Sequence, residues 1–180
     1  PAYIADFNQI LEKHGLYSVH YAHAGSGALH LRPILNLKTA EGIRRFRTIA
    51  EEIALLVKKY KGSLSGEHGD GRLRGEFIPQ MLGEHVYGLC KAVKHIWDPE
   101  GIFNPGKIVD TPPMDTSLRF EPDQSTPEFE TVFDFSAQQG IVRAAEQCNG
   151  SGDCRKSAET GGTMCPSYMA TRREHDTTRA

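Results

Sequence analysis

The chain has 180 residues, of which 38% are hydrophobic and 24% are charged, a balance typical of a folded domain with a buried core. Its 21 basic and 23 acidic residues give a formal net charge of -2, so no basic surplus is present to displace counterions from phosphates, and no nucleic-acid partner is expected. No apolar run approaches the roughly 20 residues of a membrane-spanning helix.

The two ends of the sequence predict a larger context. The chain begins at Pro1 without an initiator methionine or a signal peptide, and it ends in a charged run over 170–180. We therefore expect a piece of a longer polypeptide. We also expect a cytoplasmic location, with peripheral association at the inner face of the membrane as an alternative.

Helical spacing of apolar residues predicts three helices, over 4–13, 39–60 and 83–97. Thr39 can cap the longest of them, whose apolar stripe is expected to face the core. We expect an α+β fold, an antiparallel sheet cap domain of ferredoxin-like type with the helices 39–60 and 83–97 packed on one face. The three arginines near the start of the longest helix are expected on a solvated face: Arg44, Arg45 and Arg47.

Between the first two helices, alternation of apolar and polar residues predicts strands over 17–24 and 28–35. If Ser26 and Gly27 are the two turn residues, His23 lies directly opposite His30, and the Cβ atoms of such a pair are about 4.5–5.5 Å apart. Two imidazoles at that separation can hold one cation, which makes both histidines candidate metal ligands. Two partly buried histidines on a sheet face are the alternative.

A glycine-rich segment, 62–74, joins the two longer helices and carries a Glu–His pair. Glycine at this density lets the backbone adopt positive φ and approach a ligand closely. Glu67 and His68 are adjacent, so on an extended backbone their side chains point to opposite sides, one toward a metal and the other toward a substrate. A flexible surface loop is the alternative interpretation.

Beyond the third helix, the sequence predicts turns and a linker. A tight turn is expected at 103–107, short strands at 108–109 and 131–135, and a helix over 137–147. Three parts follow from this pattern: a domain over 1–110, a linker or strap over 111–135, and a small helical segment over 136–180.

Three of the four cysteines, Cys148, Cys154 and Cys165, cluster near the end of the chain. The first two have the spacing of the first and third cysteines in a Cys-x2-Cys-x2-Cys-x3-Cys-Pro iron–sulfur run, with Ser151 at the middle position and a longer final gap. Thiolates favour iron–sulfur clusters or zinc over hard cations. We expect the start of a truncated 4Fe-4S ferredoxin-type domain, whose missing ligand is Ser151 or a residue beyond the C-terminus. A zinc site is the alternative.

Three motifs are shared, in order, with a known family: His23-Ala-Gly-Ser-Gly-Ala-Leu-His30, Ser65-Gly-Glu-His-Gly-Asp-Gly71 and Trp97-Asp-Pro-Glu-Gly-Ile-Phe-Asn-Pro-Gly-Lys107. Together they resemble the C-terminal part of FAD-linked oxidases of the vanillyl-alcohol oxidase type. That group includes D-lactate dehydrogenases, glycolate oxidase subunits and D-2-hydroxyglutarate dehydrogenases. The tail, Cys148-Asn-Gly-Ser-Gly-Asp-Cys-Arg155 with Met164-Cys-Pro-Ser-Tyr168, resembles the iron–sulfur extension of large fused members.

The resemblance implies a divalent metal (zinc, manganese or iron) held by His23, His30 and Glu67 beside the flavin, with His68 as the base. It also implies that most of the FAD site belongs to an N-terminal FAD-binding domain of the same parent chain. The turn residues that it places near the flavin and the substrate are Asn104, Gly106 and Lys107.

Two departures from the family pattern affect the expected substrate. Ser26 and Ala28 replace the Asp and Asn of many relatives in the first motif, and Arg32 stands just past the second histidine, where relatives often carry Asn. A guanidinium at this position can hold a carboxylate by two parallel hydrogen bonds.

The implied reaction is oxidation of a D-2-hydroxy acid (D-lactate, glycolate or D-2-hydroxyglutarate) to the 2-oxo acid. The substrate chelates the metal, His68 takes the hydroxyl proton, and the hydride passes to FAD. Arg32, Arg72 or Arg74 neutralises carboxylate charge, and electrons leave through the cluster to a quinone or protein acceptor. A zinc-stapled, non-catalytic interaction module and an electron-transfer subunit are the competing hypotheses.

Overall fold

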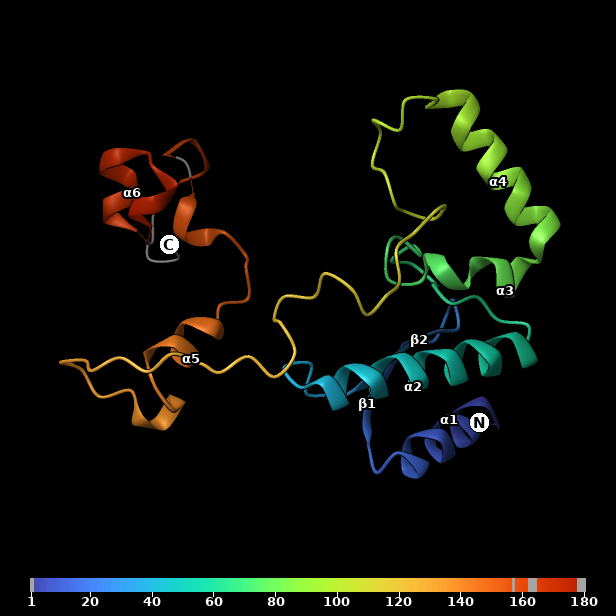
Figure 1. Ribbon diagram of the computed structural model, residues 1–180, viewed down its shortest axis with the longest axis horizontal. Helices are drawn as coiled ribbons and strands as arrows, with labels where there is room; N and C mark the ends of the chain where they lie inside the picture. The colour runs from blue at the N-terminus through green and yellow to red at the C-terminus, as the bar shows by residue number, and fades with distance from the viewer. Residues whose placement is uncertain (1, 157, 162–164, 178–180) are drawn as a thin grey trace. The chain divides into compact units, whose positions relative to one another are not determined.

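The computed structural model describes residues 2–156, 158–161 and 165–177 (Figure 1). The chain divides into two compact units, Pro1–Gln124 and Ser125–Ala180. Over the described residues, no helix is both long and apolar enough to cross a membrane.

The first unit is built on two helices, α1 (Ala2–Lys13) and α2 (Ala40–Lys59), which pack along each other (Figure 1). Phe7 and Leu11 of α1 are each 1% exposed and form a core cluster with Ile49 of α2. Burial of large apolar side chains at this level is the main stabilising contribution to such a helix pair, about 1.5–3 kcal/mol per side chain. The pair is the base on which the rest of the unit is placed.

The start of α2 shows why the sequence predicted this helix correctly. The Thr39 hydroxyl accepts a hydrogen bond from the Gly42 amide at 3.0 Å, which satisfies one of the free N–H groups of the first turn and confirms the predicted cap. The predicted solvated face is correct for Arg44, which is exposed. It is wrong for Arg45, because this side chain donates to the carbonyl of His14 at the end of α1.

Between these helices, β1 (Ser18–His23) and β2 (Ala28–Pro33) form a two-stranded antiparallel sheet. The expected pairing of the two histidines is wrong: His30 lies opposite Tyr21, and His23 lies opposite Ala28. The turn explains the difference, because four residues separate the strands and the His23 carbonyl accepts from the amides of the third and fourth. Since the error is two residues, both histidines remain on the same face of the sheet.

After the glycine-rich segment 62–74, called the central loop from here on, the chain continues through a 3-10 turn (Gly75–Phe77), α3 (Ile78–Leu82) and α4 (Glu84–Trp97). We expected this last helix to pack beside α2 on the sheet, but it packs against α3, and none of its residues is buried. The reason is the break at Gly83, whose φ of 85° starts α4 in a new direction.

A strap over 111–116 returns the chain to α2. Met114 is 1% exposed and packs into a second core cluster with Ala54 of α2 and Phe77. The strand expected at 108–109 does not form; instead this segment leads, in irregular backbone, to the buried methionine.

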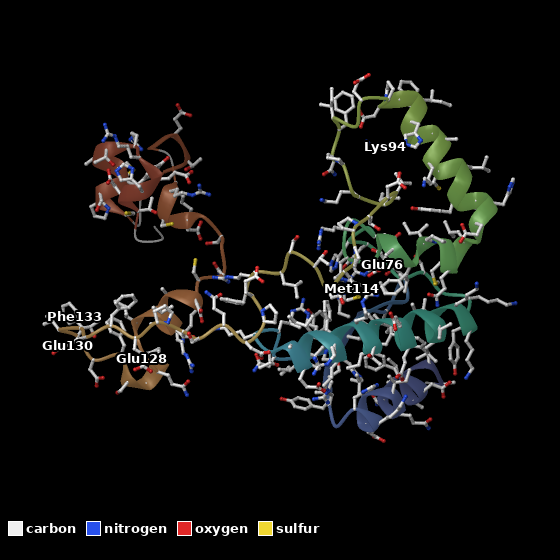
Figure 2. The ribbon with its side chains drawn as sticks, in the orientation of Figure 1. Glu76, Lys94, Met114, Glu128, Glu130 and Phe133 are labelled. Carbon is white, nitrogen blue, oxygen red and sulfur yellow. The ribbon has the colours of Figure 1, made fainter. Side chains whose placement is uncertain are left out.

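Polar contacts hold the strap in place at its buried end. The Arg47 guanidinium makes two hydrogen bonds of 2.8 Å to the Asp115 carboxylate and two of 3.1 Å to Glu76. Glu76 also accepts from the Met114 amide at 2.7 Å, and Figure 2 shows these two residues side by side. Arg47 is therefore an anchor, and the expectation of a solvated arginine is wrong here as well.

The second unit contains two short helices, α5 (Ile141–Glu146) and α6 (Pro166–Thr171). The strand expected at 131–135 does not form. The helix expected over 137–147 is divided into a 3-10 turn and α5, because Gln139 and Gly140 have φ values of 60° and 111°. The 3-10 turns of this unit are Ser136–Gln138, Asp153–Arg155, Ala158–Thr160 and Glu174–Asp176.

Candidate metal and substrate site

The hairpin has two faces with different roles, because side chains alternate along each strand. On the inner face, Leu31 packs against the core between α1 and α2, and the His20 ring meets the Phe7 ring with centroids 5.7 Å apart. This packing fixes the hairpin and leaves its outer face to carry the candidate site. The outer face presents Tyr21, His23, Ala28, His30 and Arg32.

The central loop lies against this outer face because Gly66 has no side chain. A Cβ atom on Gly66 would lie 3.1 Å from the Cβ atom of Ala28. The close approach places the Glu67 carboxylate on both histidines: one oxygen is 3.0 Å from His30 Nε2, and the other is 3.4 Å from His23 Nε2. The two imidazole rings are 5.0 Å apart. Residues far apart in the sequence thus meet at one point.

His68 joins the same group. Its Nε2 atom lies 3.1 Å from a Glu67 oxygen, and its ring is 5.4 Å from the ring of His30. The expectation that Glu67 and His68 point to opposite sides is therefore wrong. The physical reason is that the loop is bent over 66–68 and Gly69 adopts a φ of 75°, so the alternation of an extended strand does not apply.

The geometry around His30 fits a cation. Its side chain is 11% exposed, and its Nε2 atom is buried without a hydrogen-bond partner among the described residues, although a Glu67 oxygen is only 3.0 Å away. The distance suits a hydrogen bond but the direction does not, so the nitrogen and the oxygen are close without satisfying each other. An unsatisfied buried nitrogen is unfavourable, and a shared cation would remove that penalty.

One ligand atom each from His23, His30 and Glu67 lies within 4.8 Å of the others. Among the described residues, this is the group of three or more His, Cys, Asp or Glu side chains gathered closely enough to hold a metal ion. Two imidazole nitrogens and a carboxylate oxygen suit zinc, manganese or iron. The donor set therefore fits the divalent metal that the sequence predicted.

An open cleft of about 950 Å³ lies beside this group, lined by the hairpin, α2 and the central loop. Arg32 and Arg74 both line it; the Arg32 guanidinium lies 4.9 Å from the Tyr21 ring centroid, and Arg74 donates to the Gly69 carbonyl at 3.2 Å. Arg72 is outside the lining and donates instead to the backbone and hydroxyl oxygens of Thr116 in the strap. The structure thus brings two of the three candidate arginines to the site.

Sequence reasoning missed Tyr21 as a site residue. Its ring stacks on His30, with centroids 4.8 Å apart and an interplanar angle of 15°, and it lies between that histidine and the Arg32 position on the outer face. The signal was present in the alternation of β1, because Tyr21 and His23 are two residues apart and share a face.

The turn that was expected to approach the flavin lies apart from the cleft. None of Asn104, Gly106 and Lys107 is among the lining residues, although Ile108, directly after them, donates to the Gly71 carbonyl of the central loop at 2.9 Å. The turn has the left-handed backbone that its glycine permits, with φ of 50° at Asn104 and 67° at Gly106.

A second residue that sequence reasoning missed, Asp98, shapes the start of this turn. It is 4% exposed, and its carboxylate accepts from the amides of Ile102 at 2.8 Å and Phe103 at 2.9 Å. The Lys94 side chain, labelled in Figure 2, pairs with it and, together with these amides, holds the pKa of Asp98 below its ordinary value. In the sequence this aspartate stands out only as a member of the third shared motif.

The cysteines of the second unit fit a cluster only in part. Cys148 is exposed, and its sulfur accepts from the Gly150 amide at 3.4 Å, a contact that suits a thiolate. Cys154 is half-buried and Cys165 is fully buried. None of the three forms a disulfide, and within the described residues their sulfurs are not gathered into a common ligand group.

Comparison with known proteins identifies the class of protein. Residues 1–108 match the family described as FAD linked oxidases, C-terminal domain, and the chain belongs to this family. The resemblance drawn from the three motifs is confirmed. No solved structure matches the chain.

Several curated relatives are similar over most of the chain. It is 36% identical to a D-2-hydroxyglutarate dehydrogenase of Pseudomonas putida, with 96% of this chain and 17% of the relative covered. It is 32% identical to a D-2-hydroxyglutarate dehydrogenase of Escherichia coli, with 94% and 16% covered, and 31% identical to a D-lactate dehydrogenase of Archaeoglobus fulgidus, with 61% and 25% covered. The chain thus spans about one sixth of the length of the first two relatives.

Proposed function

We propose that this chain is the metal- and substrate-binding part of an FAD-dependent dehydrogenase that oxidises a D-2-hydroxy acid to the 2-oxo acid. One observation carries the proposal: His23, His30 and Glu67 converge on one point with His68 beside them, in a chain of the FAD-linked oxidase family. The FAD would be bound by an N-terminal domain of the same parent chain. Relatives named D-2-hydroxyglutarate dehydrogenase make D-2-hydroxyglutarate the first substrate to test.

The chain's own residues would bind and deprotonate the substrate. A divalent metal, when bound by His23, His30 and Glu67, would supply a Lewis acid that lowers the pKa of the substrate hydroxyl. His68 would then accept the hydroxyl proton, since its ring lies beside His30 and Glu67 and its side chain is 58% exposed, within reach of a substrate held at the metal. The oxidation also removes a hydride from the substrate carbon, and the FAD, when bound, supplies the acceptor.

The second unit would supply an electron-transfer centre. We propose a 4Fe-4S cluster with Cys148, Cys154 and Cys165 among its ligands, supported by their spacing and by the Gly150 amide that donates to the Cys148 sulfur. When bound by these residues, the cluster would supply single-electron transfer toward a quinone or protein acceptor.

The dehydrogenase is tested by mixing the complete parent polypeptide anaerobically with D-2-hydroxyglutarate, D-lactate and glycolate in turn while following flavin absorbance. We expect bleaching by D-2-hydroxyglutarate. The His68→Gln variant should keep its metal but reduce flavin about 10²–10⁴-fold more slowly. His85→Gln, at an exposed position of α4, is the matched control and should behave as the wild type. A flavin that stays oxidised with all three acids would contradict the proposal.

The cluster is tested by iron and acid-labile sulfide analysis of the anaerobically purified parent polypeptide. Cys148→Ser and Cys154→Ser should each lower the iron content by about four atoms per chain, as loss of one 4Fe-4S cluster requires. Cys90→Ser is the matched control, because this half-buried cysteine of α4 belongs to the first unit. Unchanged iron and sulfide in both test variants would rule out a cluster on these residues, and zinc in their place would indicate a structural zinc site.

A further inference from the structure

Arg32 borders the proposed site, and its N–H donors are uncommitted among the residues that the structure describes. Its guanidinium lies 4.9 Å from the Tyr21 ring centroid, a cation–π contact that orients the side chain without occupying its N–H donors. In the described part of the chain, no carboxylate forms an ion pair with Arg32, and no oxygen accepts a hydrogen bond from it. A guanidinium on a cleft wall, with its donors free, is suited to bind an anion that enters the cleft.

The other two candidate arginines are already engaged. Arg74 donates to the Gly69 carbonyl, which holds the central loop in its bent form. Arg72 donates to both oxygens offered by Thr116, outside the cleft. Arg32 is therefore the best placed of the three to bind a substrate carboxylate.

The position of Arg32 along β2 separates it from the reacting end of the substrate. It is two residues beyond His30 on the same face, about 6.6–6.8 Å further along the strand. Ala28, where Gly66 brings the central loop in, is two residues from His30 in the opposite direction. The other two candidate ligands, His23 and Glu67, thus lie on one side of the His30 position and Arg32 lies on the other, with the Tyr21 ring stacked on His30 and in contact with Arg32.

We propose that Arg32 binds the second carboxylate of a dicarboxylic D-2-hydroxy acid whose first carboxylate and hydroxyl lie at His23, His30 and Glu67. The inference rests on the proposed function and narrows its substrate to dicarboxylates. Two methylene groups between the reacting carbon and the second carboxylate, as in D-2-hydroxyglutarate, together with the reach of an arginine side chain, span the separation along β2. The planar guanidinium can hold that carboxylate by two parallel hydrogen bonds.

The test compares two substrates that share the reacting end but differ in the second carboxylate. Using the complete parent polypeptide, kcat/KM is measured for D-2-hydroxyglutarate and for D-2-hydroxybutyrate. Arg32→Gln should lower kcat/KM about 10–100-fold for the dicarboxylate, mainly through KM, because a charge-assisted hydrogen-bond pair is lost. The monocarboxylate should change less than about twofold. Arg32→Lys should recover part of the loss, since it keeps the charge without the paired geometry.

Two further measurements separate binding from damage to the site. Glutarate, which lacks the hydroxyl, should inhibit the wild type competitively and lose at least about tenfold in affinity with Arg32→Gln. The metal content of the variant should equal that of the wild type. Arg44→Gln is the matched control, because Arg44 pairs with Glu41 on the exposed face of α2.

The outcomes distinguish this inference from the proposed function. If none of the tested 2-hydroxy acids reduces the flavin of the wild type, both the proposed function and this inference are overturned. A wild type that oxidises D-2-hydroxyglutarate while Arg32→Gln leaves the ratio of the two kcat/KM values unchanged would overturn only the role of Arg32. Equal losses for both substrates would place Arg32 at the shared reacting end and refute binding of the second carboxylate.

Discussion

Replacing Gly66 by alanine tests how closely the proposed site depends on the approach of the loop to the hairpin. The new Cβ atom would lie 3.1 Å from the Ala28 Cβ and 3.8 Å from its Cα. Carbon atoms in contact are normally about 3.5–4.0 Å apart, and a Cβ atom cannot rotate away, so the loop must retreat by about half an ångström. Glu67 is the next residue and would move with it.

The expected effect is large on the site and small on overall stability. Functional sites tolerate about 0.5 Å of displacement, and a displacement of 1 Å can lower activity by about 10²-fold. We therefore expect Gly66→Ala to weaken metal binding and flavin reduction about tenfold. The free energy of unfolding should change by less than about 1 kcal/mol, because alanine also restricts the unfolded chain.

The assay measures metal affinity and the rate of flavin reduction in the complete parent polypeptide. Gly25→Ala is the matched control, since a Cβ atom at this glycine of the hairpin turn would meet nothing within 4 Å. Ala28→Gly in the Gly66→Ala background removes the contacting methyl group and should restore most of the loss. Wild-type metal affinity in Gly66→Ala, or a double variant no better than the single one, would refute the reasoning.

Three further predictions concern the metal and the strap. Glu67→Gln should lower the metal content at least about tenfold in elemental analysis, with thermal unfolding unchanged, because one anionic ligand is replaced by a neutral one of the same shape; full metal content would contradict it. Met114→Ala should lower the local opening free energy of the strap and α2 by about 2–5 kcal/mol in hydrogen exchange, since a side chain that is 1% exposed is removed, and unchanged protection would refute this. The Arg47 guanidinium holds the pKa of Asp115 below its ordinary value, so the pair stabilises the fold above the unfolded pKa of about 3.9, and this contribution is lost as the pH falls through the lower folded-state pKa. Asp115→Asn should remove this part of the pH dependence of hydrogen exchange in the strap. A pH profile identical to that of the wild type would contradict the prediction.

The sequence predicted most where local patterns decide the structure. The helix over 39–60 carries its own stripe and its own cap at Thr39, so its limits were correct within one residue. The hairpin was also recognised, but the turn sequence Gly25-Ser26-Gly27 permits loops of two or four residues, and the choice between them sets the pairing. The two histidines still share one face of the hairpin despite this error, because side-chain direction along a strand repeats every two residues.

The features that the sequence did not predict depend on partners far along the chain. Arg47 was expected in solvent, yet its carboxylate partners are 29 and 68 residues away. Asp98 directly follows α4, and its role depends on the path of the turn that follows it. Such partners follow from the tertiary structure, and no local periodicity encodes them.

The central loop is anchored on both sides of Glu67 and His68, and this arrangement connects the fold to the proposed chemistry. At its start, Gly66 rests on Ala28 of the hairpin, and at its end the Gly71 carbonyl and Arg72 are tied to Ile108 and Thr116 by hydrogen bonds. Glu67 and His68 lie between these anchors, with side chains 43% and 58% exposed. The two residues that would bind the metal and accept the proton thus combine a defined position with access from the cleft.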